Sequence, residues 1–237
     1  MQLDLIFPCY NPPKNWHLET YKNYQEISKS IPDVVIHLYV VDDGSKNDIE
    51  QESLDYLSKN IPHFHFLRYE KNKGKGFALR FAVEKTQSEK QIYTDIDVPF
   101  GVKSILDVYE ALRNGADVVT GLRDDVYYQK VPFKRKVISQ VAQTLNKLFL
   151  KLPIKDTQAG LKGFNKIGKE TFLITKVNEF LFDTEFLALA HKFKHKITII
   201  PISLKPDIIL SRIKANILWR ELRNFFNICY RINFKKR

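Results

Sequence analysis

Two aspartates separated by one residue are the clearest sign of chemistry in this sequence. Asp95 and Asp97 follow a short apolar run at residues 91–94. Two carboxylates this close at the end of a strand can both reach one hard cation, so the pair is a candidate site for Mg²⁺ or Mn²⁺. A cation there would neutralise the charge that develops on a diphosphate leaving group. An Asp-x-Asp sequence is also common in solvated turns, and a turn is the more frequent outcome when the motif stands alone.

A second acidic pair ends another apolar run. Residues 34–41 are followed by Asp42, Asp43, Gly44 and Ser45. One of the two acids could accept a hydrogen bond from an N–H group of a nucleotide base. Alternatively, Asp43 or Ser45 caps the next helix. A cap would not account for both acids, because adjacent carboxylates repel each other unless a cation or hydrogen-bond donors lie nearby.

A glycine-rich and lysine-containing segment precedes a predicted helix. Its sequence, at residues 72–78, is Asn-Lys-Gly-Lys-Gly-Phe-Ala. Glycines allow close backbone approach, a helix N-terminus favours anions, and Lys75 adds positive charge, so a diphosphate is a suitable ligand. The spacing is not that of a Walker A loop. An ordinary surface turn explains this segment equally well when it is considered alone.

The elements that position these residues alternate between strands and helices. The sequence predicts strands at residues 3–7, 34–41, 64–69, 91–94, 118–121 and 197–202. It predicts helices at residues 16–30, 48–59, 76–85, 102–113, 133–150 and 183–192, a polar loop at 156–164, and a basic helical segment after Pro206. This alternation predicts an α/β fold, with a mainly parallel sheet and helices on both faces. In such sheets the ligand binds beyond the carboxyl ends of the strands, where polar clusters follow residues 7, 41 and 94.

The bulk properties fit one catalytic domain, residues 1–204, with a C-terminal appendage, residues 205–237. Hydrophobic residues make up 44% of the 237 residues and charged residues 27%, which is ordinary for a globular protein and excludes a disordered one. Cys9 and Cys229 cannot form a disulfide framework, so we expect a reducing, cytoplasmic setting. We find no secretory signal and no apolar stretch of the roughly 18 residues needed to span a bilayer.

The order of the motifs resembles that of the family 2 glycosyltransferases. Four motifs carry this resemblance: Pro-x-Tyr-Asn at 8–11, Val-Asp-Asp-Gly-Ser at 41–45, the segment 72–78, and Asp-x-Asp at 95–97. Two later segments, 156–164 and 182–185, resemble the dolichyl-phosphate glucose and mannose synthase branch, the glucose synthases above all. The resemblance covers nearly the whole chain and implies a GT-A-like, Rossmann-type nucleotide-sugar-binding fold.

The resemblance also implies roles for individual residues. The nucleotide sugar is expected at Pro8, Tyr10, Asn11, Asp42, Asp43, Lys75 and Asp95, and the metal at Asp95 and Asp97. The acceptor phosphate is expected at Arg123, Arg135 and Ser139, and the sugar or acceptor also at Asp156, Gln158, Gly160 and Lys162. The expected catalytic residues are Asp95, Asp97, Asp183 and Glu185. Many mannose synthases have a metal-assisting glutamine where this chain has Pro99, so that third ligand is missing here.

The reaction implied by the resemblance is transfer of a hexose, with inversion, from a nucleotide sugar to a polyprenyl or dolichyl phosphate. A UDP-hexose is the favoured donor, glucose the favoured sugar, and GDP-mannose the alternative. A phosphate monoester is largely dianionic near neutral pH, since its second pKa is about 6. Positioning and charge stabilisation could therefore replace a strong general base. Asp183 and Glu185 would orient the sugar or the acceptor, although Asp183 could equally be a helix N-cap.

The C-terminal segment is basic and amphipathic. Residues 205–237 contain nine basic and two acidic residues, so they carry +7 of the net charge of +11. In a helix over 216–231 one face would hold Leu218, Trp219, Leu222, Phe225, Phe226 and Cys229. Such a helix suits an anionic membrane surface, here the inner face of the membrane. The alternative is a helix that packs this face on the catalytic domain.

Two other functions fit parts of the sequence. A glycan or cell-envelope polymer as acceptor would keep the enzyme class but would not need Arg123, Arg135 and Ser139. A nucleic-acid-binding protein would use the basic segment at residues 205–237. We expect no nucleic acid partner, because the aromatic side chains of this segment face away from the basic ones instead of interleaving with them.

Overall fold

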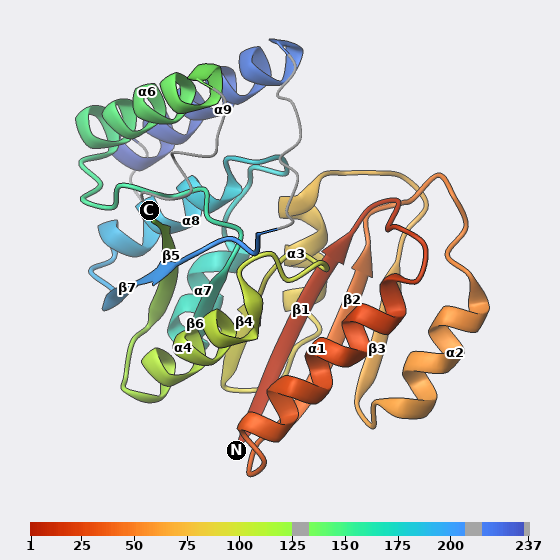
Figure 1. Ribbon diagram of the computed structural model, residues 1–237. Helices are drawn as coiled ribbons and strands as arrows, with labels where there is room; N and C mark the ends of the chain where they lie inside the picture. The colour runs from red at the N-terminus through yellow and green to blue at the C-terminus, as the bar shows by residue number, and fades with distance from the viewer. Residues whose placement is uncertain (125–132, 207–214, 235–237) are drawn as a thin grey trace.

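A seven-stranded sheet forms the centre of the molecule (Figure 1). The computed structural model describes residues 1–124, 133–206 and 215–234. The strands are β1 (Gln2–Cys9), β2 (Val35–Asp42), β3 (Phe64–Arg68), β4 (Lys90–Tyr93), β5 (Val118–Arg123), β6 (Lys162–Asn165) and β7 (Ile197–Ile202). Their order across the sheet is β3-β2-β1-β4-β6-β5-β7, and every strand except β6 runs in the same direction. The mainly parallel sheet predicted from the sequence is confirmed.

Helices cover both faces of the sheet. They are α1 (Trp16–Ser30), α2 (Gln51–Asn60), α3 (Lys75–Val83), α4 (Gly101–Arg113), α6 (Phe133–Leu150), α7 (Lys166–Leu173), α8 (Phe182–Lys192) and α9 (Ala215–Asn233). One hydrophobic core packs α1, α2 and α4 against one face, and a second core packs α3, α7, α8 and α9 against the other. Because both faces are covered, the central strands are apolar throughout: every residue of β1 after Gln2 is buried.

The chain reverses its direction across the sheet next to β1. From β1 it proceeds through β2 to β3 on one side, and it then returns to place β4 on the other side of β1. The connections that leave the carboxyl ends of β1 and β4 therefore diverge. In open α/β sheets a ligand crevice forms at such a switch point. Asp95, two residues after β4, lies at this position.

The predicted loop at residues 156–164 is wrong in its last part. Lys162–Asn165 forms β6, which pairs antiparallel with β4 on one side and with β5 on the other. Its four residues, Lys-Gly-Phe-Asn, contain no alternation of apolar and polar residues, so its neighbours determine its strand form. The sequence also gave no indication of α7, and α2 begins at Gln51 instead of residue 48.

The C-terminal helix α9 packs on the domain. Four of its residues are buried in the core that it shares with α8: Phe225, Ile228, Cys229 and Ile232. The alternative of a domain-packed helix is thus confirmed for this side of α9. The apolar face expected from the sequence is divided, because Phe225 and Cys229 point inward while Trp219 and Phe226 are 74% and 54% exposed.

We expect Ile228→Ala to lower the free energy of unfolding by about 2–5 kcal/mol, because it leaves a cavity in a closed core. Ile228 is fully buried, whereas Phe226, two residues before it, is mostly exposed. Phe226→Ala is the matched control and should change stability by less than about 1 kcal/mol. Urea denaturation of both variants measures the difference. Equal losses would contradict the packing of α9 described here.

Candidate active site

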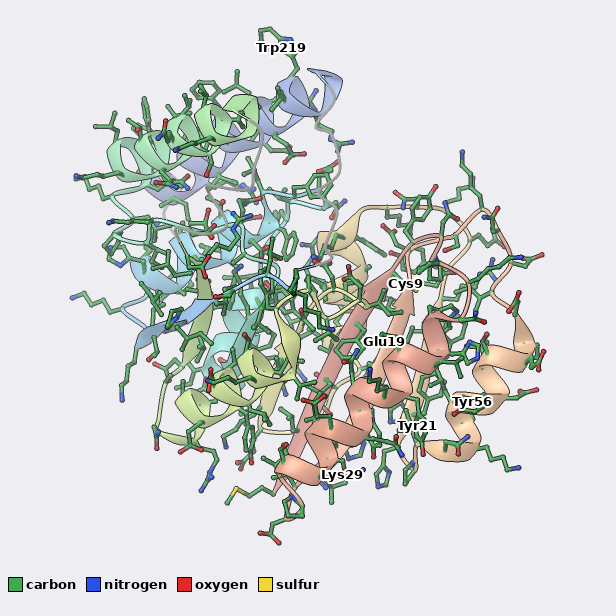
Figure 2. All side chains as sticks on the ribbon, viewed as in Figure 1. Cys9, Glu19, Tyr21, Lys29, Tyr56 and Trp219 are labelled. Atoms are coloured by element: carbon green, nitrogen blue, oxygen red, sulfur yellow. The ribbon has the colours of Figure 1, made fainter. Side chains whose placement is uncertain are left out.

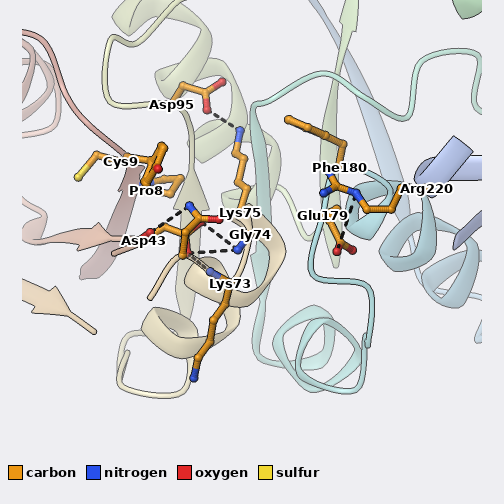
Figure 3. A pocket seen from close by; sticks show the side chains of 12 residues that line it. Pro8, Cys9, Asp43, Lys73, Gly74, Lys75, Asp95, Glu179, Phe180 and Arg220 are labelled. Atoms are coloured by element: carbon orange, nitrogen blue, oxygen red, sulfur yellow. Dashed lines mark hydrogen bonds and ion pairs between the residues drawn. The ribbon is translucent and has the colours of Figure 1, made fainter. Parts of the chain in front are cut away.

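A pocket of about 510 Å³ opens at the carboxyl ends of β1, β2 and β4 (Figure 3). Its wall is formed by Pro8, Cys9, Tyr10, Asp43, Asn72, Lys73, Gly74, Lys75, Asp95, Glu179, Phe180 and Arg220. These residues come from the ends of three strands, the segment before α3, the segment before α8, and α9. The structure thus brings together Asp43, Lys75 and Asp95, one residue from each of the three motifs that the sequence suggested.

Asp43 holds the glycine-rich segment in place. Its buried carboxylate accepts hydrogen bonds from the Tyr69 hydroxyl at 2.6 Å and from the backbone N–H groups of Lys73 at 2.8 Å and Gly74 at 3.0 Å. The Asn72 amide donates a further bond at 2.9 Å. Burial, together with the nearby carboxylate of Asp43, raises the pKa of the Tyr69 hydroxyl. One acid therefore fixes the backbone of the segment that the sequence suggested for a diphosphate.

Asp42 faces different partners. Its Oδ1 accepts from the backbone N–H and the hydroxyl of Ser45 at 3.0 and 2.5 Å, and its Oδ2 lies 3.2 Å from Nε of Arg68. These donors explain how two adjacent acids can be buried together. Neither Asp43 nor Ser45 caps α2, whose N-cap residue is Glu50.

Asn11 supports the same turn instead of lining the pocket. Its Oδ1 accepts from the backbone N–H of Lys46 at 2.9 Å, and its own N–H donates to the Ser45 hydroxyl at 2.7 Å. Of the residues expected to hold the nucleotide sugar, Pro8, Tyr10, Asp43, Lys75 and Asp95 line the pocket, whereas Asn11 and Asp42 shape the loops around it.

The Asp95 carboxylate forms an ion pair with Lys75 across the pocket. Their side chains meet at 2.5 Å, and Lys75 is the first residue of α3. Burial disfavours the charge of Lys75, but the carboxylates of Asp95 and Asp183 outweigh this effect, so the pKa of Lys75 is raised. Gly160 approaches the same pair, since a Cβ atom at this glycine would lie 2.7 Å from Oδ2 of Asp95. A side chain at residue 160 would therefore displace the carboxylate.

Asp97 is exposed and lies close enough to Asp95 for their charges to interact. Partial desolvation and the neighbouring carboxylate of Asp95 raise the pKa of Asp97. In the part of the chain that the structure describes, no group of three or more His, Cys, Asp or Glu residues could hold a metal ion. Two carboxylates nevertheless fit Mg²⁺ or Mn²⁺, because such ions retain several water ligands and complete their shell with substrate phosphates.

Asp183 lies behind this pair and is fully enclosed. It accepts a hydrogen bond from the Tyr93 hydroxyl and lies 3.1 Å from the ammonium of Lys162, which is itself fully buried and donates to the Ala159 carbonyl at 2.6 Å. Burial raises the pKa of Asp183 and lowers that of Lys162. Asp183 is not an N-cap, because the N-cap of α8 is Leu181. Its carboxylate instead forms a buried ion pair that adjoins Lys75.

Glu185 points away from the pocket. Its carboxylate accepts from the backbone N–H groups of Lys176 and Val177 at 2.9 and 2.8 Å and pairs with Arg231 of α9 at 2.6 Å. Residues two apart on a helix do not share a face, so Asp183 and Glu185 cannot both face one site. The observed partners of Glu185 therefore make it a support for the loop before α8.

The residues expected at the acceptor phosphate are only partly placed. Arg123 pairs with Asp156 through two contacts, at 2.6 and 2.7 Å, and this pairing outweighs burial and lowers the pKa of Asp156. Ser139 is half-buried in α6 and accepts from the Gln143 amide at 3.4 Å. The Arg135 side chain lies outside the described residues. Gln158, from the same loop as Asp156, donates to the Thr184 hydroxyl at 2.9 Å.

Comparisons with known proteins decide the family. The family model of Glycosyl transferase family 2 matches residues 4–169. The chain belongs to this family. The resemblance predicted from the order of the motifs is confirmed.

Two of three relatives of this family 2 chain carry names from the predicted branch. Glycosyltransferase AglD from Haloferax volcanii is 25% identical over 211 residues, covering 87% of this chain and 33% of the relative. The human dolichyl-phosphate beta-glucosyltransferase is 26% identical, covering 81% and 64%, and the dolichol-phosphate mannosyltransferase of Pyrococcus furiosus is 28% identical, covering 72% and 47%. The chain thus spans less than two thirds of the length of each relative.

Solved structures confirm the expected GT-A-like fold of this family 2 chain. Glucosyl-3-phosphoglycerate synthase from Mycobacterium tuberculosis, solved with Mn²⁺, UDP and phosphoglyceric acid, matches with a TM-score of 0.67 at 14% identity. The match covers 99% of this chain and 80% of that protein.

Sequence reasoning did not single out seven residues that line the pocket of this family 2 chain: Cys9, Asn72, Lys73, Gly74, Glu179, Phe180 and Arg220. Asn72 and Gly74 belong to a motif that was recognised, and attention to every residue of that motif would have found them. Glu179, Phe180 and Arg220 lie beyond the matched residues 4–169. Arg220 reaches the pocket because α9 packs against α8, and Glu179 and Phe180 reach it because the loop before α8 is hydrogen-bonded to α3. No local pattern predicts that arrangement.

We expect Lys162→Met to lower the free energy of unfolding by about 3–5 kcal/mol, because Asp183 would be left as an uncompensated buried charge. Combining Lys162→Met with Asp183→Leu removes both charges and should cost clearly less than the single change. Urea denaturation of both variants measures the difference. A loss below about 1 kcal/mol for Lys162→Met would contradict a buried pair that depends on this lysine.

Proposed function

We propose that the chain is an inverting glycosyltransferase that moves a hexose from a nucleotide sugar to a polyprenyl or dolichyl phosphate at the cytoplasmic face of a membrane. The observation that carries this proposal is the convergence of Asp43, Lys75 and Asp95 in one pocket at the switch point of the sheet. Family membership supplies the reaction class. The relatives named for dolichyl phosphate favour the lipid acceptor.

The donor occupies the pocket between β1, β2 and β4 in this proposal. The base lies near Pro8, Tyr10 and Asp43, and the diphosphate lies near the backbone of residues 73–75. A Mg²⁺ or Mn²⁺ ion bound at Asp95 and Asp97 would neutralise charge on the leaving diphosphate. Lys75, already charged beside Asp95, adds a second positive charge at the same place. UDP and glucose are favoured because three relatives are named dolichyl-phosphate beta-glucosyltransferases and a structural neighbour was solved with UDP.

The acceptor phosphate needs orientation more than it needs a base. Near neutral pH a phosphate monoester is largely dianionic, so it can attack the anomeric carbon without first losing a proton to the protein. Arg123, Arg135 and Ser139 remain the proposed acceptor ligands. The bidentate pairing with Asp156 would hold the Arg123 guanidinium in a fixed orientation toward such a phosphate.

A transfer assay tests this function. The chain is incubated with radiolabelled UDP-glucose, UDP-galactose or GDP-mannose and a polyprenyl phosphate, with Mn²⁺, with Mg²⁺ or with a chelator. Label that enters the organic phase only when both the lipid and the metal are present supports the proposal. Label that enters a water-soluble glycan instead would identify the other acceptor class, and no transfer from any donor would refute the proposal.

Asp95→Asn and Asp97→Asn should each lower metal-dependent transfer by about 100-fold or more, because either change removes a carboxylate from the metal site and forfeits several kcal/mol of charge stabilisation. Asp107→Asn is the matched control, since Asp107 lies on α4 and pairs with Lys103. The melting temperatures of all three variants should remain close to that of the wild type. Full activity in Asp95→Asn would rule out its assignment as a metal ligand.

Several large apolar side chains of α6 and α9 are exposed, and we assign the outer surface of these two helices to the membrane. Its exposed apolar residues are Val137, Val141, Leu148, Leu218, Trp219, Leu222, Phe226, Tyr230 and Phe234. Figure 2 shows Trp219 projecting from the end of the molecule away from α1 and α2. The segment 205–237 contains nine basic and two acidic residues, a composition that favours contact with anionic lipid. Among the residues that the structure describes, no helix is long and apolar enough to cross a membrane.

Trp219→Ser combined with Phe226→Ser should reduce flotation with anionic vesicles by about tenfold or more, because it removes two large apolar side chains from the membrane contact. The matched control, Leu18→Ser combined with Ile167→Ser, removes comparably exposed side chains from α1 and α7. Vesicles of phosphatidylcholine with and without phosphatidylserine separate apolar from electrostatic binding. If the two double variants float to the same extent, α9 is not the membrane contact.

A further inference from the structure

One side of α9 faces the pocket, opposite to the ends of β1 and β2. Arg220 lines the pocket together with Glu179 and Phe180 from the segment before α8 (Figure 3). None of these three residues lies within the residues 4–169 matched by the family model. The pocket therefore has one wall built from the recognised motifs and another that belongs to the C-terminal part of this chain.

The guanidinium of Arg220 has unused hydrogen-bonding capacity. Its Nε lies 3.4 Å from Glu221 and 4.0 Å from Glu179, and the side chain is 49% exposed. Its two terminal nitrogens donate to no other residue that the structure describes. A planar guanidinium with free terminal N–H groups suits bidentate binding of a phosphate.

The other two basic residues of the pocket are already engaged. Lys75 is bound to Asp95, and the ammonium of Lys73 lies 4.4 Å from the centre of the Phe77 ring. In Figure 3 the Lys73 side chain extends away from Lys75 and Asp95. Arg220 is thus the basic residue of this pocket that is neither bound to Asp95 nor directed away from it.

Hydrogen bonds fix the position of Arg220 relative to the proposed diphosphate segment. The Glu221 carboxylate accepts from the Leu181 backbone at 3.1 Å, and the Asn224 amide donates to Glu179 at 3.1 Å, so α9 is joined to the loop before α8. That loop is joined to α3, because the Asn178 carbonyl accepts from the backbone N–H of Gly76 at 2.7 Å. Both walls of the pocket are therefore connected through one loop.

We propose that Arg220 binds a phosphate group of a substrate in this pocket, either the diphosphate of the donor or the phosphate of the lipid acceptor. The inference rests on the proposed function and extends the site to α9. Trp219, the residue before Arg220, projects to solvent on the apolar surface assigned to the membrane. The same turn of α9 would then contact the membrane with one residue and a substrate phosphate with the next.

The test uses the full chain with Arg220→Gln, Arg220→Lys and the control Arg223→Gln, which removes an exposed arginine of α9 that does not line the pocket. UDP binding is measured by calorimetry without lipid, and the KM values for nucleotide sugar and polyprenyl phosphate are measured separately. We expect Arg220→Gln either to weaken UDP binding or to raise the KM for polyprenyl phosphate, in each case by about 10- to 100-fold, because hydrogen bonds to charged groups are strong. Arg220→Lys should recover part of the loss. Arg223→Gln should match the wild type in UDP affinity and in the KM for the nucleotide sugar, both of which are measured on water-soluble ligands.

The arms of the test identify the source of the phosphate. A weaker UDP affinity in Arg220→Gln assigns the contact to the donor, and a raised KM for polyprenyl phosphate with unchanged UDP affinity assigns it to the acceptor. A lower melting temperature with unchanged affinity and KM values would reveal a purely structural role and overturn the inference. So would wild-type values throughout. A wild-type chain without UDP binding or sugar transfer would overturn the proposed function as well.

Discussion

The ion pair between Lys75 and Asp95 joins the parts of the pocket that the chain builds separately. Asp95 follows β4, Lys75 begins α3, and Gly160 of the loop before β6 leaves room beside both. Three segments therefore meet around two opposite charges. The contact is possible because the sheet switches direction next to β1, so that β4 ends beside β1 instead of at an edge. Any cation or diphosphate in the pocket must be accommodated around this pair.

Behind that pair the charges continue into the core. The carboxylates of Asp95 and Asp183 both raise the pKa of Lys75, and Asp183 in turn pairs with Lys162. Each buried charge thus has a neighbour of opposite sign, which offsets the cost of removing it from water. Such pairs contribute little net stability, but they fix the relative positions of β4, β6 and α8 because none of their members can move alone. The ion pair between Asp183 and Lys162 therefore holds together the elements behind Lys75 and Asp95.

The sequence predicted the parts of the molecule that depend on local patterns. Apolar runs located six of the seven strands, the polar residues after two of them led to Asp43 and Asp95, and the glycine-rich segment before a predicted helix led to Lys75. It did not reveal β6, whose strand form depends on its two neighbouring strands. It also did not reveal that Asp42 fixes a turn while Asp43 lines the pocket. Glu185 matched a motif, yet its partners are backbone groups and an arginine on α9, which only the folded chain brings together.

Helix α9 has three sides with three different environments, and its geometry links them. Successive residues of a helix are rotated by about 100°, so Trp219, Arg220 and Ile228 necessarily face different directions. Ile228 lies in the core, Arg220 at the pocket and Trp219 in solvent. The buried side fixes the rotation of the helix about its axis. Once that rotation is fixed, the distance between the apolar surface and the pocket is also fixed. A lipid-borne phosphate that reaches the pocket from this surface would therefore always meet the same side of α9.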